Sequence, residues 1–318
     1  MAEPLVSIVI ATRERPELLQ RAIRSILRQT LREIEIVVVD DGSSQETRAQ
    51  YERSMEDGDE RVSYHFANEA TPQARGVCPA RNLGLRRARA PYVVFFDDDD
   101  EMTTTDHLEV AVEHHRRRPK CLYFADLRMV KNGQTVLDAR LRPVDEPMTK
   151  RQLEPGKPVY EATLEEFGKV FTRRYPHLNA TVLDVGLTKE IGGFAETLIF
   201  CEDLNFFLRY ADVASTVLYR RETVVDFDAT PRPRMFDAPA PVLRDLMISM
   251  ALSKARTSIR NRHLLRSSAA IEAHMLAEAA EKLNDAGNGI AARYLALQSL
   301  ILRVTRNGLR QGWRSLLS

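Results

Sequence analysis

Short apolar runs and stretches of helical periodicity alternate along most of this chain. The near-continuous apolar runs at 7–11, 34–39 and 92–96 are typical of central parallel strands, because such strands are covered on both faces. Between them, apolar residues recur at helical spacing over 16–27 and 80–90, which predicts helices packed on the same sheet. The alternation predicts an α/β fold with a doubly wound sheet.

Weaker signals extend this pattern towards residue 230. We expect further helices from about 106 and over 204–211, and further strands at 61–66, 121–125, 134–139, 179–183, 213–219 and 223–227. Between 142 and 176 prolines are frequent and apolar runs are few, so a mobile segment or a loop on the acceptor side is expected there.

Polar residues follow the strands at the points where they end. The first strand runs into Thr12-Arg13, the second into Asp40-Asp41-Gly42-Ser43, and a later one into the four carboxylates of Asp97–Asp100. In open α/β sheets, ligands bind at these carboxyl ends. Four adjacent carboxylates repel one another, and a divalent cation with a phosphorylated ligand would relieve that repulsion. A solvated acidic turn is the alternative.

The composition changes after residue 233. From 241 to 318 the chain is helix-rich and carries 12 Lys or Arg against 5 Asp or Glu, although the formal net charge of the whole chain is only +1. We therefore divide the chain into a region at 1–235 and a basic helical region at 236–318. Arginines and apolar residues interleave as far as Trp313, a pattern suited to an anionic membrane surface. The alternative is a helix packed on the rest of the protein or on a partner subunit.

Membrane-spanning, secreted and zinc-binding classes are not indicated. No apolar run approaches the ~18–20 residues that a membrane span needs, and the apolar start at 5–11 lacks the features of a signal peptide. The cysteines at 78, 121 and 201 are far apart and odd in number, which favours reduced thiols and a cytoplasmic setting. No nucleic-acid-binding module accompanies the basic tail, so we expect no nucleic-acid partner.

Six motifs in order give the chain a resemblance to a known family over roughly residues 5–230. They are Val6–Arg13, Ser25–Thr30, Val37–Ser43, Ala80–Gly84, Phe96–Asp100, and Ile191–Phe194 with Glu202-Asp203. The chain resembles the family-2 glycosyltransferases of the GT-A fold. The resemblance implies a Rossmann-like mixed sheet flanked by helices, a nucleoside-diphosphate-sugar donor, and an inverting transfer to a hydroxyl acceptor.

The resemblance also implies which residues hold the donor. The residues that would border the base are Ala11, Thr12 and Arg13. Asp41 would accept an N–H of the base, which suits uracil or thymine, whereas an Asx turn with Gly42 is its alternative role. Arg81 would reach the diphosphate, or would merely balance charge at the surface.

The acidic run matches the family's D-x-D-D signature. By that match Asp97 and Asp98 contact the sugar nucleotide, with Asp98 near the ribose, and Asp99 holds Mn²⁺ or Mg²⁺ between the phosphates. A metal there makes chemical sense, because the nucleoside diphosphate leaves as an anion. Asp97 and Asp100 would also shape the turn, and a slip of one position would move the metal ligand to Asp98 or Asp100.

By the same resemblance, Asp203 takes the position of the general base that removes the proton from the acceptor hydroxyl. Glu202 is the substitute if the register differs by one, and an acid pair that merely stabilises a helix start is the alternative. Family members often carry a metal-binding His after the last core strand. The stretch 224–230 has no His, so either Asp228 stands in for it or fewer protein groups hold the metal.

The expected protein is therefore a metal-dependent glycosyltransferase that uses a UDP- or dTDP-sugar in cell-surface polysaccharide or glycoconjugate synthesis. Its acceptor would be a glycan, a lipid-linked glycan or a small molecule. We expect it in the cytoplasm or at the inner face of the membrane, with membrane contact or self-association through the C-terminal helices. The rivals are a sugar-nucleotide pyrophosphorylase, against which the glycine-free loop 12–16 counts, and a non-catalytic sugar-nucleotide-binding subunit.

Overall fold

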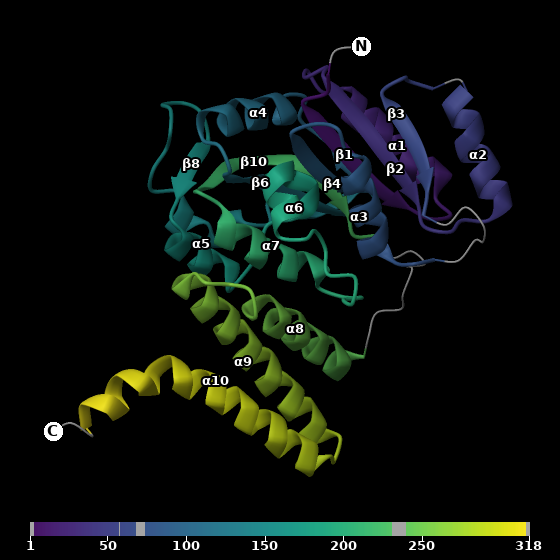
Figure 1. Ribbon diagram of the computed structural model, residues 1–318. Helices are drawn as coiled ribbons and strands as arrows, with labels where there is room; N and C mark the ends of the chain where they lie inside the picture. The colour runs from purple at the N-terminus through teal and green to yellow at the C-terminus, as the bar shows by residue number, and fades with distance from the viewer. Residues whose placement is uncertain (1–2, 57, 68–73, 231–239, 316–318) are drawn as a thin grey trace.

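A ten-stranded mixed sheet forms the centre of the protein. The computed structural model describes residues 3–56, 58–67, 74–230 and 240–315, except the side chains of 55, 56 and 304–315. The main strand order is β3-β2-β1-β4-β9-β6-β10-β5. Helices lie on both faces of this sheet, and a separate layer of three helices stands to one side of it (Figure 1).

The parallel half of the sheet is built from the apolar runs that the sequence predicts. Strand β1 (Val6–Thr12) pairs in parallel with β2 (Ile34–Asp40) and β4 (Tyr92–Asp97), and β2 pairs with β3 (Val62–Phe66). Every residue of β2 is buried, as expected for a strand covered on both faces. The register sets Thr12 beside Asp40 and Ala11 beside Asp97, so the polar residues that end these three strands meet at one edge.

The other half of the sheet is mixed. Strand β9 (Thr181–Asp184) runs antiparallel between β4 and β6 (Leu122–Lys131), and β10 (Val217–Asp228) runs parallel to β6. The short strands at its margins are β5 (Glu101–Met102), β7 (Gln134–Leu137) and β8 (Val159–Ala162). The two separate strands expected at 213–219 and 223–227 are wrong, because β10 is one strand whose register shifts between Arg220 and Val225.

Helices cover the sheet, and most of them lie where the sequence predicts a helix. These helices are α1 (Pro16–Leu27), α2 (Gln45–Glu56), α3 (Val77–Arg87), α4 (His107–Arg117), α6 (Val185–Glu190) and α7 (Glu202–Val213). Pro16 occupies the first turn of α1, where the lack of an N–H costs nothing. Helix α3 packs closely on β1 at Gly84, where a Cβ atom would lie 2.2 Å from Cγ1 of Val9. That approach brings Arg81 of the same helix to the strand ends.

The segment 142–176 is more regular than its sequence suggests. It contains two short 3₁₀ turns, η1 (Arg142–Val144) and η2 (Glu146–Met148), the strand β8, and helix α5 (Leu164–Phe171). A capping box opens α5, because Thr163 and Glu166 each bond the other's backbone N–H. The segment is therefore not a loop over 159–162 and 164–171, and its place on the acceptor side stays a prediction. The T-x-x-E spacing was the signal that could have found this helix.

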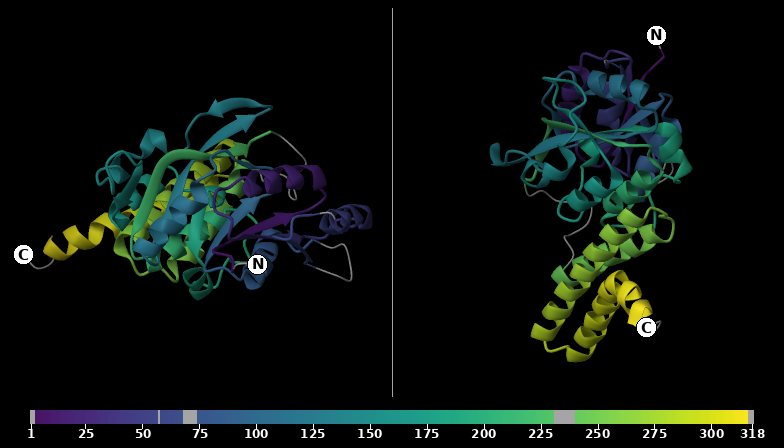
Figure 2. Two further views of the ribbon diagram at one scale, coloured as in Figure 1. Left: turned by 90° about the horizontal axis from the view of Figure 1, so that it is seen from above. Right: turned by 90° about the vertical axis from the view of Figure 1, so that its left-hand side faces the viewer.

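Three helices form the C-terminal region, α8 (Pro241–Arg256), α9 (Arg262–Asp285) and α10 (Gly289–Ser315), and they extend away from the sheet (Figures 1 and 2). Asn205 of α7 donates to the backbone oxygen of Ala251 in α8 at 2.9 Å, and Ser267 of α9 donates to that of Gly168 in α5 at 3.1 Å. The boundary proposed at 235/236 falls outside the described residues. None of the described helices combines the length and the apolar character that crossing a membrane requires.

Candidate active site at the strand ends

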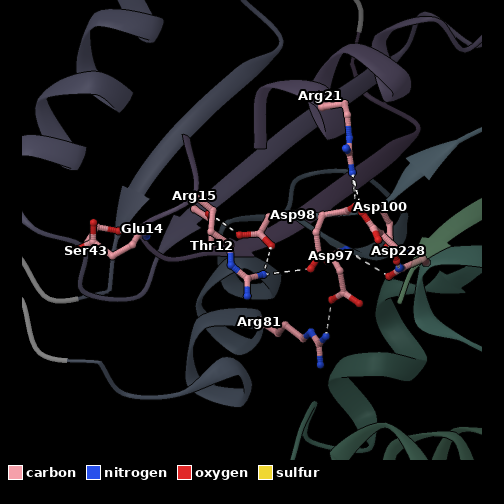
Figure 3. A network of polar contacts seen from close by, with 12 residues as sticks. Thr12, Glu14, Arg15, Arg21, Ser43, Arg81, Asp97, Asp98, Asp100 and Asp228 are labelled. Atoms are coloured by element: carbon pink, nitrogen blue, oxygen red, sulfur yellow. Dashed lines mark hydrogen bonds and ion pairs between the residues drawn. The ribbon is translucent and has the colours of Figure 1, made fainter. Parts of the chain in front are cut away.

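Arg15 is the cation that pairs with the two middle carboxylates of the acidic run. It lies just before α1, and its Nη1 pairs with Asp98 at 3.0 Å and with Asp99 at 3.2 Å (Figure 3). Thr12 also donates its hydroxyl to Asp98 at 2.7 Å. Burial raises the pKa of Asp98, and the charge of Arg15 opposes that rise. The sequence prediction did not include Arg15, because the family motif at the end of the first strand points to the neighbouring Arg13.

Arg81 connects the acidic run to the candidate base pair. Its guanidinium pairs with Asp97 at 2.8 Å and with Glu202 at 2.9 Å, and only 6% of the residue is exposed. Burial alone would lower the pKa of Arg81, but the charges of Asp97 and Glu202 outweigh this effect and raise it. The surface-charge alternative for Arg81 is therefore wrong. Its predicted contact with the donor diphosphate stays a prediction.

Asp100 fixes the shape of the acidic turn. It is fully buried, accepts a hydrogen bond from Nδ2 of Asn179, and accepts another from the backbone N–H of Asp228 at 2.8 Å. The side chain of Asp228 in turn pairs with Arg21 at 3.4 Å (Figure 3). The predicted role of Asp100 in supporting the turn agrees with these contacts, which join β4 to β10.

A possible metal-binding group lies beside this turn. One ligand atom each from Asp97, Asp100 and His177 lies within 4.8 Å of the other two, the one such group found among the described residues. The buried Nδ1 atom of His177 has no hydrogen-bond partner there, and its ring packs edge-on to Phe227 with centroids 5.0 Å apart. Carboxylate oxygens with one imidazole suit Mn²⁺ well and Mg²⁺ less well.

This group differs from the sequence prediction in two ways. The predicted ligand Asp99 does not belong to it, and its carboxylate faces Arg15 instead. His177 lies just before the 3₁₀ turn η3 (Leu178–Ala180), whereas sequence reasoning sought a histidine only after the last core strand. The assignment of the metal to Asp99 stays a prediction. No motif or spacing in the sequence points to His177.

Asp41 lies at the end where the base is expected. It is fully buried, and its carboxylate accepts the backbone N–H groups of Arg75 at 2.8 Å and Gly76 at 2.9 Å. Burial raises the pKa of Asp41, and the nearby charge of Arg13 opposes this rise. The turn after this strand is bonded by Asp40, which accepts the N–H of Ser43 at 3.1 Å, whereas the carboxylate of Asp41 bonds the loop amides at 75 and 76.

The loop after β1 is fastened to the loop after β2. Glu14 adopts a left-handed backbone with φ 56°, which is uncommon for a residue other than glycine. Its carboxylate accepts hydrogen bonds from the hydroxyls of Ser44 at 3.1 Å and Thr47 at 2.6 Å, and its N–H donates to Ser43 at 2.9 Å. These contacts fix the backbone around Arg13, which the prediction places beside the base.

The candidate base Asp203 stands in the first turn of α7. Cys201, directly before that helix, has a left-handed backbone with φ 57°, and the N–H of Leu204 donates to Asp203 at 2.7 Å. Burial first, and the adjacent charge of Glu202 second, raise the pKa of Asp203 to about 6. A carboxylate with a pKa near the working pH is well suited to accept a proton from a hydroxyl.

The sequence model of the family described as "Glycosyl transferase family 2" matches residues 7–174, just over half of the chain. The chain belongs to glycosyl transferase family 2. This confirms the family and the GT-A fold class expected from the six motifs. The matched range covers the residues expected to hold the donor, and it ends before Asp203.

Curated glucosyltransferases match a shorter part of the chain. A GalNAc(5)-diNAcBac-PP-undecaprenol beta-1,3-glucosyltransferase of Campylobacter jejuni is 38% identical over 29% of this chain and 28% of its own. A Validoxylamine A glucosyltransferase of Streptomyces hygroscopicus is 43% identical over 29% of this chain and 21% of its own. The matched segment thus spans well under half the length of these two relatives.

Two solved structures share the fold over most of the chain. TarS 1-349 of S. aureus in complex with UDP-GlcNAc has a TM-score of 0.63 at 19% identity, and the match covers 86% of this chain and 72% of that one. The mannosyltransferase PcManGT of Pyrobaculum calidifontis, in complex with GDP-Man and Mn²⁺, has a TM-score of 0.61 at 18% identity, with coverages of 99% and 84%. At these identities the likeness concerns the fold.

Proposed function

We propose that this protein is an inverting, metal-dependent glycosyltransferase. The observation that supports it best is the path Asp97–Arg81–Glu202, two ion pairs that join the acidic turn to the helix start carrying Asp203. A donor at the turn and an acceptor hydroxyl at Asp203 would then be neighbours. In this arrangement the hydroxyl oxygen attacks the anomeric carbon on the face opposite the leaving nucleotide, while Asp203 takes up the proton.

The donor side is proposed from the residues around Asp41 and the acidic turn. The residues that would border the base are Ala11, Thr12 and Arg13, and Asp41 would accept a base N–H. Each carboxylate oxygen of Asp41 already accepts one loop amide, at 75 or 76, and keeps a further lone pair for the base N–H. Arg81 would approach the diphosphate, and Asp98 the ribose.

The metal site is proposed near the same turn. The residues that would hold Mn²⁺ or Mg²⁺ are Asp99, as the family signature implies, or Asp97, Asp100 and His177, as their proximity indicates. When bound, a divalent ion would neutralise charge developing on the leaving diphosphate. Arg15, already paired with Asp98 and Asp99, would lie beside the same diphosphate.

The ligands and acceptors of similar proteins guide the choice of donor and acceptor class. TarS binds UDP-GlcNAc and PcManGT binds GDP-Man, so a UDP- or dTDP-sugar remains our first choice and a GDP-sugar the second. The two glucosyltransferases act on an undecaprenol-linked glycan and on a small molecule, which keeps both acceptor types open. We place the reaction in the cytoplasm, in cell-surface polysaccharide or glycoconjugate synthesis.

A thermal-shift panel of UDP-, dTDP- and GDP-sugars with Mn²⁺ tests the donor assignment. We expect one class to raise the melting temperature by several degrees when its concentration is about 100 times its Kd. A response to nucleoside triphosphate with a sugar phosphate would favour the pyrophosphorylase. No response to any sugar nucleotide, with or without Mn²⁺, would overturn the proposal. A donor that binds and is never turned over would support the non-catalytic subunit.

A further inference from the structure

Helix α10 is apolar on two sides, and α9 covers only one of them. On the covered side Ala292 and Ser299 are buried, and the Ser299 hydroxyl donates to the backbone oxygen of Ala273 at 2.6 Å. The other side carries large apolar residues with high exposed fractions. They are Ile290 (87%), Tyr294 (62%), Leu297 (54%), Leu300 (55%) and Ile301 (46%).

The spacing of these residues makes them a continuous stripe. Positions 290, 294, 297 and 301 fall within about 60° of one another around a helix of 3.6 residues per turn. Single exposed apolar residues are normal on protein surfaces. Among the described residues, however, nine large apolar residues are exposed, and five of them lie in about three turns of α10. We call this set, 290, 294, 297, 300 and 301, the α10 stripe.

The positive charge of α10 indicates which kind of surface covers the stripe. After Asp285 the sequence contains five arginines and no acidic residue. Arg293 and Arg303 are exposed, whereas the side chains of the other three lie outside the described part of the chain. A symmetric dimer through this face would bring two such helices together and oppose like charges. Anionic lipid headgroups instead provide the opposite charge, and the acyl boundary receives the apolar side chains.

We propose that the α10 stripe docks this protein on an anionic lipid surface, with the helix lying in the plane of the headgroups. Helix α10 lies at the end of the three-helix layer farthest from the sheet (Figures 1 and 2). Lipid contact there leaves the strand ends at Asp97 open to their ligands. Neither the family match at 7–174 nor the proposed chemistry requires this surface.

Vesicle flotation of the full chain tests the proposal. We expect binding to phosphatidylcholine vesicles that contain phosphatidylglycerol, little binding to phosphatidylcholine alone, and weakening by salt. The double variant Leu297→Glu/Ile301→Glu should lower the bound fraction about tenfold or more, because it places two charges in the apolar contact. The control is Val136→Glu, a change at a similarly exposed apolar residue (55%) of β7, and it should bind as the natural chain does.

Three results would overturn the proposal. The first is no binding to anionic vesicles, and the second is equal binding by the double variant and the natural chain. The third is light scattering that shows a stable dimer of the natural chain and a monomer of the double variant. The last result would make the stripe an interface between two copies. Because both substituted residues are exposed, the melting temperature should stay close to that of the natural chain, which separates lost docking from lost folding.

Discussion

Replacing Asp203 by Asn should stabilise the fold while it abolishes sugar transfer. Burial and Glu202 raise the pKa of Asp203 from 3.8 to about 6. A shift of that size corresponds to at most about 3 kcal/mol of free energy, because one pKa unit is worth about 1.36 kcal/mol. The amide has no charge to bury, and its oxygen can still accept the N–H of Leu204.

The sign of the effect depends on pH. A raised pKa means that the folded protein binds this proton more tightly than the unfolded chain does. The contribution of Asp203 to stability is therefore fully present below pH 3.8 and is lost as pH rises to about 6. We expect Asp203→Asn to be more stable than the natural protein by about 1–3 kcal/mol at pH 8, with the gap closing towards pH 4.

Urea unfolding at pH 5 and pH 8 measures this difference. The control is Asp138→Asn, the same change at a side chain that is 80% exposed, which should alter the free energy of unfolding by less than about 0.5 kcal/mol. Activity supplies a second readout. Transfer by the natural enzyme should rise about tenfold per pH unit below 6 and then level off. If Asp203→Asn destabilises the protein at pH 8, or retains near-normal turnover, the reasoning is refuted.

Three further predictions concern the strand ends. If His177 is a ligand, His177→Ala should weaken Mn²⁺ binding about tenfold, because one of three protein ligands is lost. Electron paramagnetic resonance measures this binding. If Mn²⁺ binding is weakened only by Asp99→Ala, the metal ligand is Asp99, as the sequence predicts. Arg15→Gln should lower the free energy of unfolding by about 1–3 kcal/mol, because it removes the cation paired with two carboxylates; an unchanged urea midpoint would contradict this. Gly84→Ala should cost about 1–3 kcal/mol through its clash with Val9, and the double variant with Val9→Ala should recover part of that loss in the same urea assay.

The parallel half of the fold could be predicted because its signals are local. Buried runs at 34–40 and 92–97 are continuous in sequence, and each is followed at once by polar residues. Helix α2 and the pairing of β9 have no such signal. Helix α2 is polar along most of its length and buries mainly Tyr51, so no apolar stripe marks it. The antiparallel insertion of β9 depends on pairing between residues about 60 to 90 positions apart, which no local pattern records.

The location of the site could be predicted, but not the role of each of its four carboxylates. Asp97 to Asp100 are identical in sequence, and only their partners tell them apart. Those partners lie on distant segments, with Arg15 before α1, Arg81 in α3 and Asn179 before β9. The direction in which each side chain leaves the turn is set by tertiary packing. A motif can place such residues together without assigning their roles.

We propose that Asp203 serves transfer from a sugar nucleotide bound at the acidic turn. The most direct test of this role is the rate of nucleoside diphosphate release, with Mn²⁺ and the donor that stabilises the natural protein, in parallel with donor binding by calorimetry. We predict that Asp203→Asn binds this donor as tightly as the natural chain and lowers the rate of release by at least about a thousandfold. Equal rates from the two proteins, or loss of donor binding in the variant, would contradict the account.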